Sequence, residues 1–591
     1  MKINETRWVM RETDADLPLM SRVLRINEIT ANAMANRGIR SKNAAISFLA
    51  PTVERLRPAF QMKGMEEAIK KIAAALPEKK IIIYGDYDAD GIMSTVILYK
   101  TLKKLGANCE YYIPHRIEEG YGLNIAAVEK LASGGGDLLI TVDNGISAIE
   151  EIKTAAELGV QTIIIDHHEP GFEDSEEDRR TVPTALLKRT DILPSAVAIV
   201  DPKQSECEYP FKEMCAAGLV FRLAVSLCEF LQNPLTQTEH DELLVLAAVA
   251  TLCDIVNLTD ENRVIVTGGL AVLNANKLIN PGLGSLITLR GYLEKPIDTF
   301  TVGFVIGPCL NATGRLESAA LAVELLLAPT DETPARLKLA QELIELNEAR
   351  KNLTLQCVER ALSETVDSEK LPKVLVLTDF EAHESVAGIV AGRIRDATCR
   401  PTILLTQGNG AVKGSGRSVE GYNLFEALYR HRHLFNRFGG HKMAAGLTLP
   451  EENIGALRTA LNNDCTLTDE DFHPILQIDR VLSPDEISLA LSDELARLAP
   501  FGKGNAEPLF ASYGLHAEKV RIINEKNTLI FTFVCKTGRR LKGIAFGLNE
   551  NYAAIFADKN ENICFDAVYC IETNVWNNNA EVQIRIKDFR C

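Results

Sequence analysis

The first half of the chain alternates short β-branched runs with longer amphipathic stretches. Strands are predicted at 81–86, 109–113, 138–142, 161–165 and 198–200, and helices at 66–75, 92–105, 126–132 and 148–158. This alternation predicts a parallel β-sheet that is covered by helices on both faces. Such sheets bind their ligands at the carboxyl ends of the strands. The residues that follow each strand are therefore the first candidates for a functional site.

Acidic residues and imidazoles follow three of the predicted strands. Any one of these residues is explained most simply as a helix cap or a turn former. Together they crowd carboxylates at one edge of the sheet, and crowded carboxylates repel one another unless they are solvated, protonated or neutralised by a cation. We therefore expect a divalent metal site at this edge, built from Asp86, Asp88, Asp90, Asp143, His167 and His168.

A further carboxylate lies in an apolar helix that is predicted from Asp241 onward. The helix ends in Thr-Leu-Cys-Asp-Ile-Val, and Asp254 is the only charged residue of these six. A buried, unpaired carboxylate is costly, so this side chain should be hydrogen-bonded, paired or bound to a metal. With the other acids nearby, we favour a metal.

A long helix is predicted between the two halves of the chain. It starts at Thr333 with Pro334 at its first position and continues to Leu362, which gives a length of about 45 Å. Before it, the segment from Asn311 to Arg315 is expected to be a loop whose guanidinium could bind a phosphate. An arginine of this kind is, on its own, more often a structural ion pair.

After the long helix, strands predicted at 373–378 and 401–405 indicate a second α/β domain. It contains three glycine-rich segments, at 388–393, 414–418 and 437–441. Glycine lets backbone N–H groups approach an anion closely, although glycine-rich turns also occur for purely architectural reasons. Between Gly388 and Met443 there are nine Lys/Arg and three Asp/Glu, which favours an anion. The candidate contacts are Ser415, Arg417, Ser418, Gly439, Gly440 and His441.

From about residue 474 the pattern becomes that of an all-β domain. Residues 581–587 alternate strictly between apolar and polar side chains, and residues 529–535 do so in part, which predicts a small antiparallel barrel. Phe531 and Phe533 either stack on bases at a single-strand-binding surface or are ordinary core residues, and these two interpretations have similar weight. The basic residues around them are Lys519, Arg521, Lys526, Lys536, Arg539, Arg540 and Lys542.

The composition of the 591 residues is that of a globular protein with several domains. Apolar residues make up 46% of the chain, and no apolar run approaches the ~20 residues that a membrane span needs. The N-terminus has no signal-peptide core, so we expect a cytoplasmic protein. Thirteen scattered cysteines without a Cys-x-x-Cys pair argue against a zinc module. The net charge of −16 argues weakly against nucleic acid, and the local basic clusters argue for it.

Four ordered segments resemble the motifs of the DHH phosphoesterase superfamily. They are Asp86-Tyr-Asp-Ala-Asp-Gly91, Thr141-Val-Asp-Asn-Gly145, Asp166-His-His168 and Thr251-Leu-Cys-Asp254. The segment from Arg437 to Gly446 resembles the DHH-associated domain. The segment from Phe501 to Phe510 resembles the start of the C-terminal domain in the RecJ branch, the single-strand-specific exonucleases. The resemblance covers nearly the whole chain beyond residue 60.

The resemblance implies a centre of two metal ions, Mn²⁺ or Mg²⁺. Mixed carboxylate and imidazole ligands suit Mn²⁺ better than Mg²⁺. In the wider superfamily a histidine often stands four residues before the first ligand, and this chain has Tyr84 there. The resemblance places His168 at the scissile phosphate, and Asp86 either orients or completes the second metal site. The implied metal ligands are Asp88, Asp90, Asp143, His167 and Asp254, with Asp143 as the bridge.

The resemblance also implies the architecture. It predicts an N-terminal arm at 1–60, a parallel-sheet DHH domain at 61–330, a connecting helix at 331–366, a DHH-associated domain at 367–465 and an OB-like barrel at 474–591. The associated domain would hold the 5′ end of a DNA strand, with Arg315 and Asn311 as further substrate contacts. The long helix would set a gap that admits single strands alone.

The implied function is exonuclease digestion of single-stranded DNA from the 5′ end to nucleoside monophosphates, in DNA repair and recombination. A helicase and a single-strand-binding protein are the expected partners, and no membrane is involved. Two alternatives remain. One is a relative that acts on small nucleotides or short oligonucleotides, which usually lacks the barrel. The other is an inactive replication scaffold, which should have lost metal ligands that this chain retains.

Overall fold

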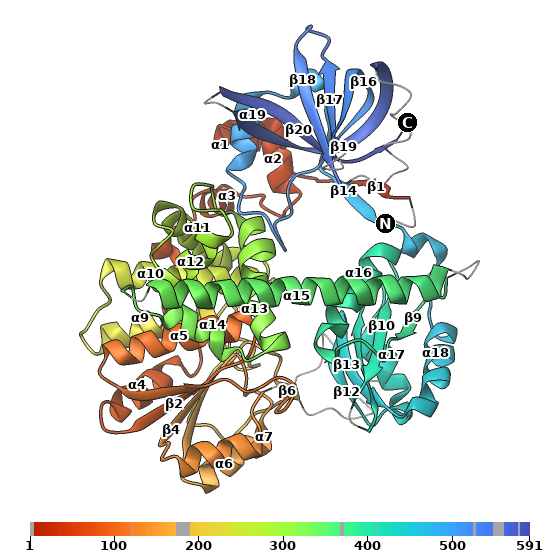
Figure 1. Ribbon diagram of the computed structural model, residues 1–591. Coiled ribbons are helices and arrows are strands. Elements are labelled where there is room, and N and C mark those ends of the chain that lie inside the picture. The colour runs from red at the N-terminus through yellow and green to blue at the C-terminus, as the bar shows by residue number, and fades with distance from the viewer. Residues whose placement is uncertain are drawn as a thin grey trace. The chain divides into compact units, whose positions relative to one another are not determined.

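The computed structural model describes residues 5–120, 122–172, 190–331, 333–366, 371–408, 410–523, 528–547, 561–576 and 579–590 (Figure 1). The chain forms two compact units. Unit 1 comprises Met1–Ala50, Lys351–Ala499 and Ala506–Cys591. Unit 2 comprises Pro51–Arg350 and Pro500–Asn505. Among the described residues, no helix combines the length and apolar character that crossing a membrane requires.

Unit 2 contains the predicted parallel sheet. Its five strands lie in the order β3-β2-β4-β5-β8, and every neighbouring pair is parallel. The predicted strands at 138–142, 161–165 and 198–200 are confirmed to the residue. The strands are β2 (Lys80–Tyr84), β3 (Asn108–Tyr112), β4 (Leu138–Val142), β5 (Gln161–Ile165) and β8 (Ala198–Val200).

Helices cover both faces of this sheet. Alternate strand residues such as Ile82 and Ile83 belong to two different apolar clusters, because successive side chains point to opposite faces. One face packs against α6 (Ile125–Ser133) and α7 (Ile149–Glu157). The other packs against α4 (Met65–Ala75), α5 (Ala89–Lys104), α9 (Ala216–Phe230) and α10 (Gln237–Cys253).

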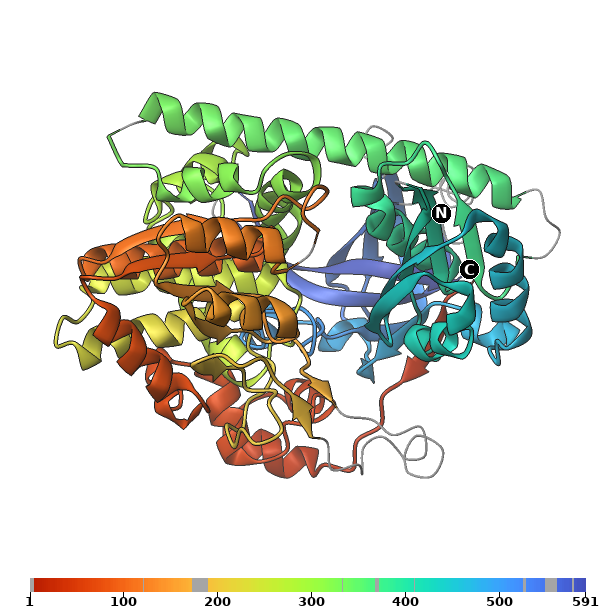
Figure 2. The ribbon, with the colours of Figure 1, turned by 90° about the horizontal axis from the view of Figure 1, so that it is seen from below.

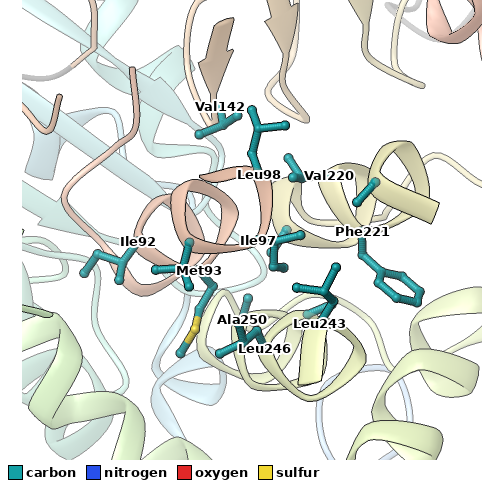
Figure 3. Close-up of a cluster of buried hydrophobic side chains, with 14 of the residues drawn as sticks. Ile92, Met93, Ile97, Leu98, Val142, Val220, Phe221, Leu243, Leu246 and Ala250 are labelled. Carbon is teal, nitrogen blue, oxygen red and sulfur yellow. The ribbon is translucent and has the colours of Figure 1, made fainter. Parts of the chain in front are cut away.

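Helix α5 is the centre of the second face. Figure 3 shows its apolar side chains packed among those of β4, α9 and α10. Burying a large aliphatic side chain contributes about 1.5–3 kcal/mol, so this packing fixes the start of α5 firmly at the sheet edge. The buried residues in the view are Ile92, Met93, Ile97 and Leu98 of α5, Val142, Val220, Phe221, Leu243, Leu246 and Ala250.

The remaining helices of unit 2 correct one prediction. Asn311 and Arg315 lie on α13 (Gly307–Leu316) and not on a loop. The local sequence is rich in poor helix formers, but its glycines allow contacts that a side chain would block: a Cβ on Gly314 would lie 2.1 Å from the Tyr87 carbonyl oxygen. The neighbouring helices are α11 (Asp260–Ala275), α12 (Pro281–Leu289), the π-helix Thr301–Ile306 and α14 (Ala320–Leu327).

The predicted long helix is confirmed as α15, Thr333–Val366, which continues four residues beyond the predicted end. Figure 2 shows it as one uninterrupted helix. The division between the two units falls within it, after Arg350. The helix is therefore the covalent link between the units in this part of the chain.

Unit 1 contains a second α/β domain with a mixed sheet in the order β12-β13-β11-β10-β9. Two predicted glycine-rich segments lie in its strands and the third lies in α16, so all three belong to regular elements. The strands are β9 (Leu375–Thr378), β10 (Thr402–Gln407), β11 (Val412–Arg417), β12 (Arg437–His441) and β13 (Ala444–Leu449). The helices are α16 (Ala387–Thr398), α17 (Leu424–Arg430) and α18 (Ile454–Asn463).

The C-terminal part of unit 1 is the predicted barrel. Its strands run in the order β16-β17-β18-β20-β19, and a further pairing of β16 with β19 closes it. The all-antiparallel prediction is wrong for two pairs of this sheet, because β18 is parallel to β20 and the short strand β15 (Arg480–Val481) is parallel to β16. The strands are β16 (Phe510–Ile523), β17 (Thr528–Val534), β18 (Arg540–Phe546), β19 (Glu561–Trp576) and β20 (Asn579–Arg590).

The aromatic residues of the barrel are core residues. Phe531 and Phe533 are buried, stack on each other at 5.7 Å and contact Phe565, so these rings cannot stack on bases. Several of the basic residues are also engaged within the domain: Arg540 pairs with Glu518 and Lys542 with Glu581. Lys526 lies outside the described residues.

The N-terminal segment packs onto the barrel domain. Strand β1 (Arg7–Met10) pairs in parallel with β14 (Ile475–Ile478), and Nε1 of Trp8 donates to Oδ2 of Asp588 at 2.7 Å. Because this segment has sheet and side-chain partners, it is part of a folded domain. Its helices are α1 (Leu17–Leu24), α2 (Glu28–Ala35) and α3 (Lys42–Leu49).

Candidate metal centre

The first acidic loop turns the chain from β2 into α5. Asp88 is the N-cap of α5, and its Oδ1 accepts from the backbone N–H groups of Asp90 at 2.9 Å and Gly91 at 3.2 Å. Only glycine fits at position 91, because a Cβ there would lie 2.6 Å from backbone atoms of Asp86. The turn therefore holds three carboxylates close together within five residues.

The second acidic position is Asp143, directly after β4. Its φ of 65° is left-handed, a conformation that Asp tolerates better than most residues, and its N–H donates to the Ile165 carbonyl at 3.0 Å. Side-chain oxygens of Asp86, Asp88 and Asp143 lie within 4.8 Å of one another. Two strand ends thus supply one cluster of carboxylates.

His167 joins this cluster to two further carboxylates. Its Nε2 lies 3.1 Å from Oδ1 of Asp143, 3.7 Å from Oδ2 of Asp90 and 3.8 Å from Oδ2 of Asp254. Asp90 is held by α9, whose first N–H groups, at Ala216 and Ala217, each donate to its carboxylate at 2.8 Å. The structure therefore brings together all the acids and imidazoles that the sequence analysis placed at this sheet edge.

The raised pKa values of the carboxylates in the cluster indicate a site that binds cations. Burial, followed by the charge of Asp88, raises the pKa of Asp90 to about 6, and burial with the charges of Asp90 and Asp88 raises the pKa of Asp254 to about 8. Burial and the surrounding carboxylates raise the pKa of Asp143 well above its ordinary range. Each carboxylate is thus unfavourable as an anion without a counter-charge.

The hydrogen bonding of the cluster supports the same conclusion. Oδ1 of Asp86 and Oδ1 of Asp143 are buried and accept no hydrogen bond from the described residues. Burial and the charge of His168 lower the pKa of His167 to about 3, so its imidazole is neutral. Converging carboxylate oxygens and a neutral imidazole nitrogen match the donors that Mn²⁺ and Mg²⁺ take in proteins.

His168 is held in a different state from His167. Its Nδ1 lies 2.7 Å from Oδ1 of Asp166. Burial lowers its pKa, but the hydrogen bond and charge of Asp166 outweigh burial and raise that pKa to about 9. His168 is therefore a cation at neutral pH, directly beside the acidic cluster.

Asp166 is a site residue to which the sequence analysis assigned no role. It is 1% exposed and also accepts from the backbone N–H groups of Ile146, His167 and His168. Burial opposes its ionisation, but the hydrogen bond and charge of His168 hold its pKa well below its usual range. Its position as the first residue after β5 was the available signal.

Arg315 lies beside the first acidic loop together with two other arginines. Burial, then the charges of Arg116 and Arg350, lower its pKa to about 10, and Asp88 acts in the opposite direction. The Arg116 guanidinium lies 4.8 Å from the centre of the Tyr87 ring. Neither Arg116 nor Arg350 was predicted, because they come from distant parts of the chain. The positive charges of these three guanidiniums act on one another, so an anionic ligand is favoured beside them.

Asn311 is engaged by the acidic loop itself. Its Oδ1 accepts from the Ala89 N–H at 2.8 Å, within the turn between Asp88 and Asp90. This contact ties α13 to the start of α5. The observed hydrogen bond therefore gives Asn311 a role in holding the loop.

Unit 1 brings most of the other predicted contacts together on its mixed sheet. Ser415 and Gly439 both pair with Gly446, and Arg417 and His441 both pair with Ala444. Residues in register share a face, so these four positions form two adjacent rows on one face of the sheet. The β13 residues between the paired positions, Ala444 and Gly446, are small, so they leave space beside the side chains of these rows.

Two glycines shape these rows. A Cβ on Gly388 of α16 would lie 2.7 Å from Nη2 of Arg417 and 2.9 Å from Oγ of Ser415, so a glycine there leaves room for both polar groups. A Cβ on Gly440 would lie 2.3 Å from the Ala444 carbonyl oxygen. Ser418 is fully buried and donates to the Tyr422 carbonyl at 2.7 Å, which gives it a structural contact.

Comparison with known proteins identifies the family. The DHH family N-terminal domain matches residues 80–251, the DHHA1 domain matches 371–466 and the RecJ OB domain matches 478–588. The single-stranded-DNA-specific exonuclease RecJ of Bacillus subtilis (strain 168) is 37% identical over 595 residues, which cover 100% of this chain and 71% of that protein. The chain belongs to the RecJ family.

Solved RecJ structures agree with the fold. RecJ of Thermus thermophilus in complex with Mn²⁺ has a TM-score of 0.80 and 30% identity, covering 99% of this chain and 79% of that one. The complex of the same protein with Mg²⁺ has a TM-score of 0.75 and 29% identity, covering 99% and 78%. The predicted fold class, a parallel-sheet DHH domain, a DHH-associated domain and an OB-like barrel, is confirmed.

Proposed function

We propose that this RecJ family member is a metal-dependent exonuclease that digests single-stranded DNA from the 5′ end to nucleoside monophosphates. The observation that carries the proposal is the convergence of Asp90, Asp143 and Asp254 on a neutral His167. Buried carboxylates with raised pKa values beside a cationic His168 suit cleavage of a phosphodiester, whose charge increases in the transition state. We further propose a role in DNA repair and recombination.

The residues that would hold the metal are Asp88, Asp90, Asp143, His167 and Asp254, and Asp86 lies beside them. Two Mn²⁺ or Mg²⁺ ions held there would supply an activated water and neutralise charge on the reacting phosphate. The chain's own residues do the remaining work. The backbone N–H groups of α9 fix Asp90, and Asn311 fixes the turn that carries Asp88.

His168 is the proposed contact to the scissile phosphate. Its protonated ring is bonded to Asp166 through Nδ1, and its positive charge beside the acidic cluster favours a phosphate oxygen. Asp166 keeps the ring charged and oriented. The two adjacent histidines therefore have different proposed roles. His167 is neutral and suited to a metal, whereas His168 is a cation that donates to the phosphate.

Phosphates away from the reacting bond need their own contacts. We propose that Arg315 and its neighbours Arg116 and Arg350 bind one of them in unit 2, where burial and mutual repulsion make an anion favourable. In unit 1, the rows that contain Ser415, Arg417 and His441 are the proposed site for the 5′ end. Ser418, Gly439 and Gly440 support those rows.

Two alternatives are less well supported. A phosphodiesterase for small nucleotides does not require the OB domain that matches residues 478–588. An inactive scaffold does not require the complete set of ligands that converges here. Cooperation with a helicase and a single-strand-binding protein remains part of the proposal, as does a cytoplasmic location, which follows from the need to reach DNA.

The test is digestion of an oligodeoxynucleotide labelled at either end, as a single strand and as a blunt duplex, with Mn²⁺. We expect immediate release of mononucleotides from the 5′ end of the single strand alone, and none from Asp143→Ala. A matched control is Asp137→Ala, a carboxylate at the opposite end of β4 that accepts from the Lys80 N–H. Intact strands with wild-type protein would contradict the proposal, and assays with short oligonucleotides and cyclic dinucleotides would then follow.

A further inference from the structure

Six residues near the barrel belong to the other unit. Pro500–Asn505 packs with unit 2, whereas the residues on both sides of it in sequence, up to Ala499 and from Ala506, belong to unit 1. A short segment of this kind needs local contacts to hold it. Those contacts lie at the turn that follows the metal-ligand candidate Asp254.

The segment forms a closed loop of its own. The N–H of Gly502 donates to the Asn505 carbonyl at 2.9 Å, and the N–H of Asn505 donates back to the Gly502 carbonyl at 3.1 Å. The buried side chain of Asn505 also donates from Nδ2 to the Pro500 carbonyl at 2.9 Å. The loop is therefore pre-formed by its own hydrogen bonds and can act as a rigid support.

This loop contacts the chain immediately after Asp254. The Leu258 N–H donates to the Lys503 carbonyl at 2.8 Å. Gly502 lies against Leu258, since a Cβ there would be 2.7 Å from Cδ1 of Leu258. Gly504 has a left-handed φ of 75°, and a Cβ there would be 3.0 Å from Cβ of Asn257. Because these two positions are glycines, the loop can approach Asn257 and Leu258 to van der Waals distance.

The turn that receives these contacts is strained. Ile255, directly after Asp254, has a φ of 56° although its side chain is β-branched, and β-branched residues rarely adopt this left-handed conformation. Such a conformation persists only where the surroundings hold it. Two further contacts hold the turn: Nδ2 of Asn257 donates to Glu213 at 2.5 Å, and Nδ2 of Asn262 donates to the Asn257 carbonyl at 3.0 Å.

The turn is thus held by Glu213 and Asn262 from within its own domain and by Pro500–Asn505 from a distant part of the sequence. Asp254 itself caps the end of α10, with its N–H bonded to the Ala250 carbonyl at 2.9 Å. Its carboxylate direction depends on where the chain turns after it. A shift of the 255–258 backbone would move Oδ2 of Asp254 relative to Nε2 of His167, 3.8 Å away.

We propose that Pro500–Asn505 is a positioning element for Asp254, which acts through the Asn257–Leu258 backbone and sets the affinity of the metal centre. The inference rests on the metal site of the proposed function. It assigns a role in metal binding to a segment that lies, in sequence, inside the barrel half of the chain. Groups that orient metal ligands typically change metal affinity by about 10–100-fold when they are lost.

The experiment compares Gly504→Ala with Gly538→Ala in the full-length protein. Gly538 has a φ of 79° in a turn of the barrel, and a Cβ placed on it would have no atom within 4 Å, so its variant carries the same backbone strain without the contact to Asn257. Mn²⁺ binding is titrated by electron paramagnetic resonance, and stability is measured by urea unfolding. We expect about tenfold weaker Mn²⁺ binding for Gly504→Ala alone.

Equal Mn²⁺ affinity in the two folded variants would overturn the inference. If Gly504→Ala does not fold, Gly504→Asn replaces it, with Gly538→Asn as control, because Asn tolerates a left-handed φ and still introduces a Cβ. Wild-type protein that binds Mn²⁺ without digesting DNA would contradict the proposed function and leave the positioning role intact. Wild-type protein that binds no Mn²⁺ would overturn both.

Discussion

Asp166 and His168 form an ion pair next to the candidate metal centre, with Oδ1 of the carboxylate 2.7 Å from Nδ1 of the imidazole. The pair keeps His168 protonated, with a pKa of about 9, while the adjacent His167 has a pKa of about 3. Two consecutive histidines therefore differ in charge at neutral pH, because Asp166 raises the pKa of His168 whereas burial and the charge of His168 lower the pKa of His167.

Asp166→Asn should lower the pKa of His168 to its ordinary value or below. Burial alone lowers that pKa, and the opposing hydrogen bond to a charged carboxylate would be gone. The raised pKa of His168 contributes stability below its unfolded value of about 6.5, which is lost as the pH rises through about 9. NMR titration of the histidine ring in metal-free protein measures the change. An unchanged pKa of His168 in the variant would show that Asp166 is not its cause.

Mn²⁺ affinity should rise with pH between about 6 and about 8. Asp90 and Asp254 have raised pKa values, so metal-free protein holds protons that a bound cation must displace. Above those pKa values Asp90 and Asp254 hold no proton to displace, so their contribution to the rise in affinity should end. Calorimetric titration in two buffers with different ionisation enthalpies counts the protons released. Asp254→Asn should release fewer, and buffer-independent heats for wild type would refute the linkage.

Tyr84→Phe should leave the number of bound metal ions unchanged. Tyr84 is fully buried, and its hydroxyl donates to the Gly122 carbonyl at 3.1 Å, within the apolar cluster on the α6–α7 face of the sheet. Loss of this hydrogen bond should cost about 1 kcal/mol of unfolding free energy. Metal stoichiometry by mass spectrometry and urea unfolding test the two parts separately. A lost metal ion in the variant would assign Tyr84 to the centre instead.

Arg585→Met should destabilise the barrel by about 1–3 kcal/mol, between values typical of exposed and buried ion pairs. The half-buried guanidinium bridges Glu507 at 2.6 Å and Glu572 at 2.7 Å. Burial raises the pKa of Glu507, but the charge of Arg585 outweighs it and lowers that pKa below 4.5. The contribution of Glu507 is therefore present above pH 4.5 and lost as the pH falls through its folded pKa.

Unfolding measured at about pH 7 and about pH 4 separates these effects. The difference between wild type and Arg585→Met should shrink at the lower pH. Lys587→Met is the matched control, since its Nζ lies 3.8 Å from Glu507 and is a weaker partner. A difference independent of pH would mean that Arg585 stabilises the barrel through packing of its aliphatic stem.

The sequence by itself determined the sheet of unit 2 and the acids at its edge. Strands such as 138–142 are continuous β-branched and aliphatic runs, and a residue that follows a parallel strand must lie at its carboxyl end. Local periodicity therefore placed Asp143 beside Asp86 and His167 before any contact was known. The order of the motifs then indicated the family.

Only the tertiary structure decided which distant groups act on that edge. Arg116 and Arg350 reach Arg315 through packing of separate elements, Asn311 lies on a helix that its glycines allow, and Pro500–Asn505 supports a turn some 240 residues earlier in the chain. The rings of Phe531 and Phe533 face the core because the barrel closes around them. Such contacts depend on how elements pack. The periodicity within one element shows which of its faces is buried, but it does not determine which distant element packs against that face.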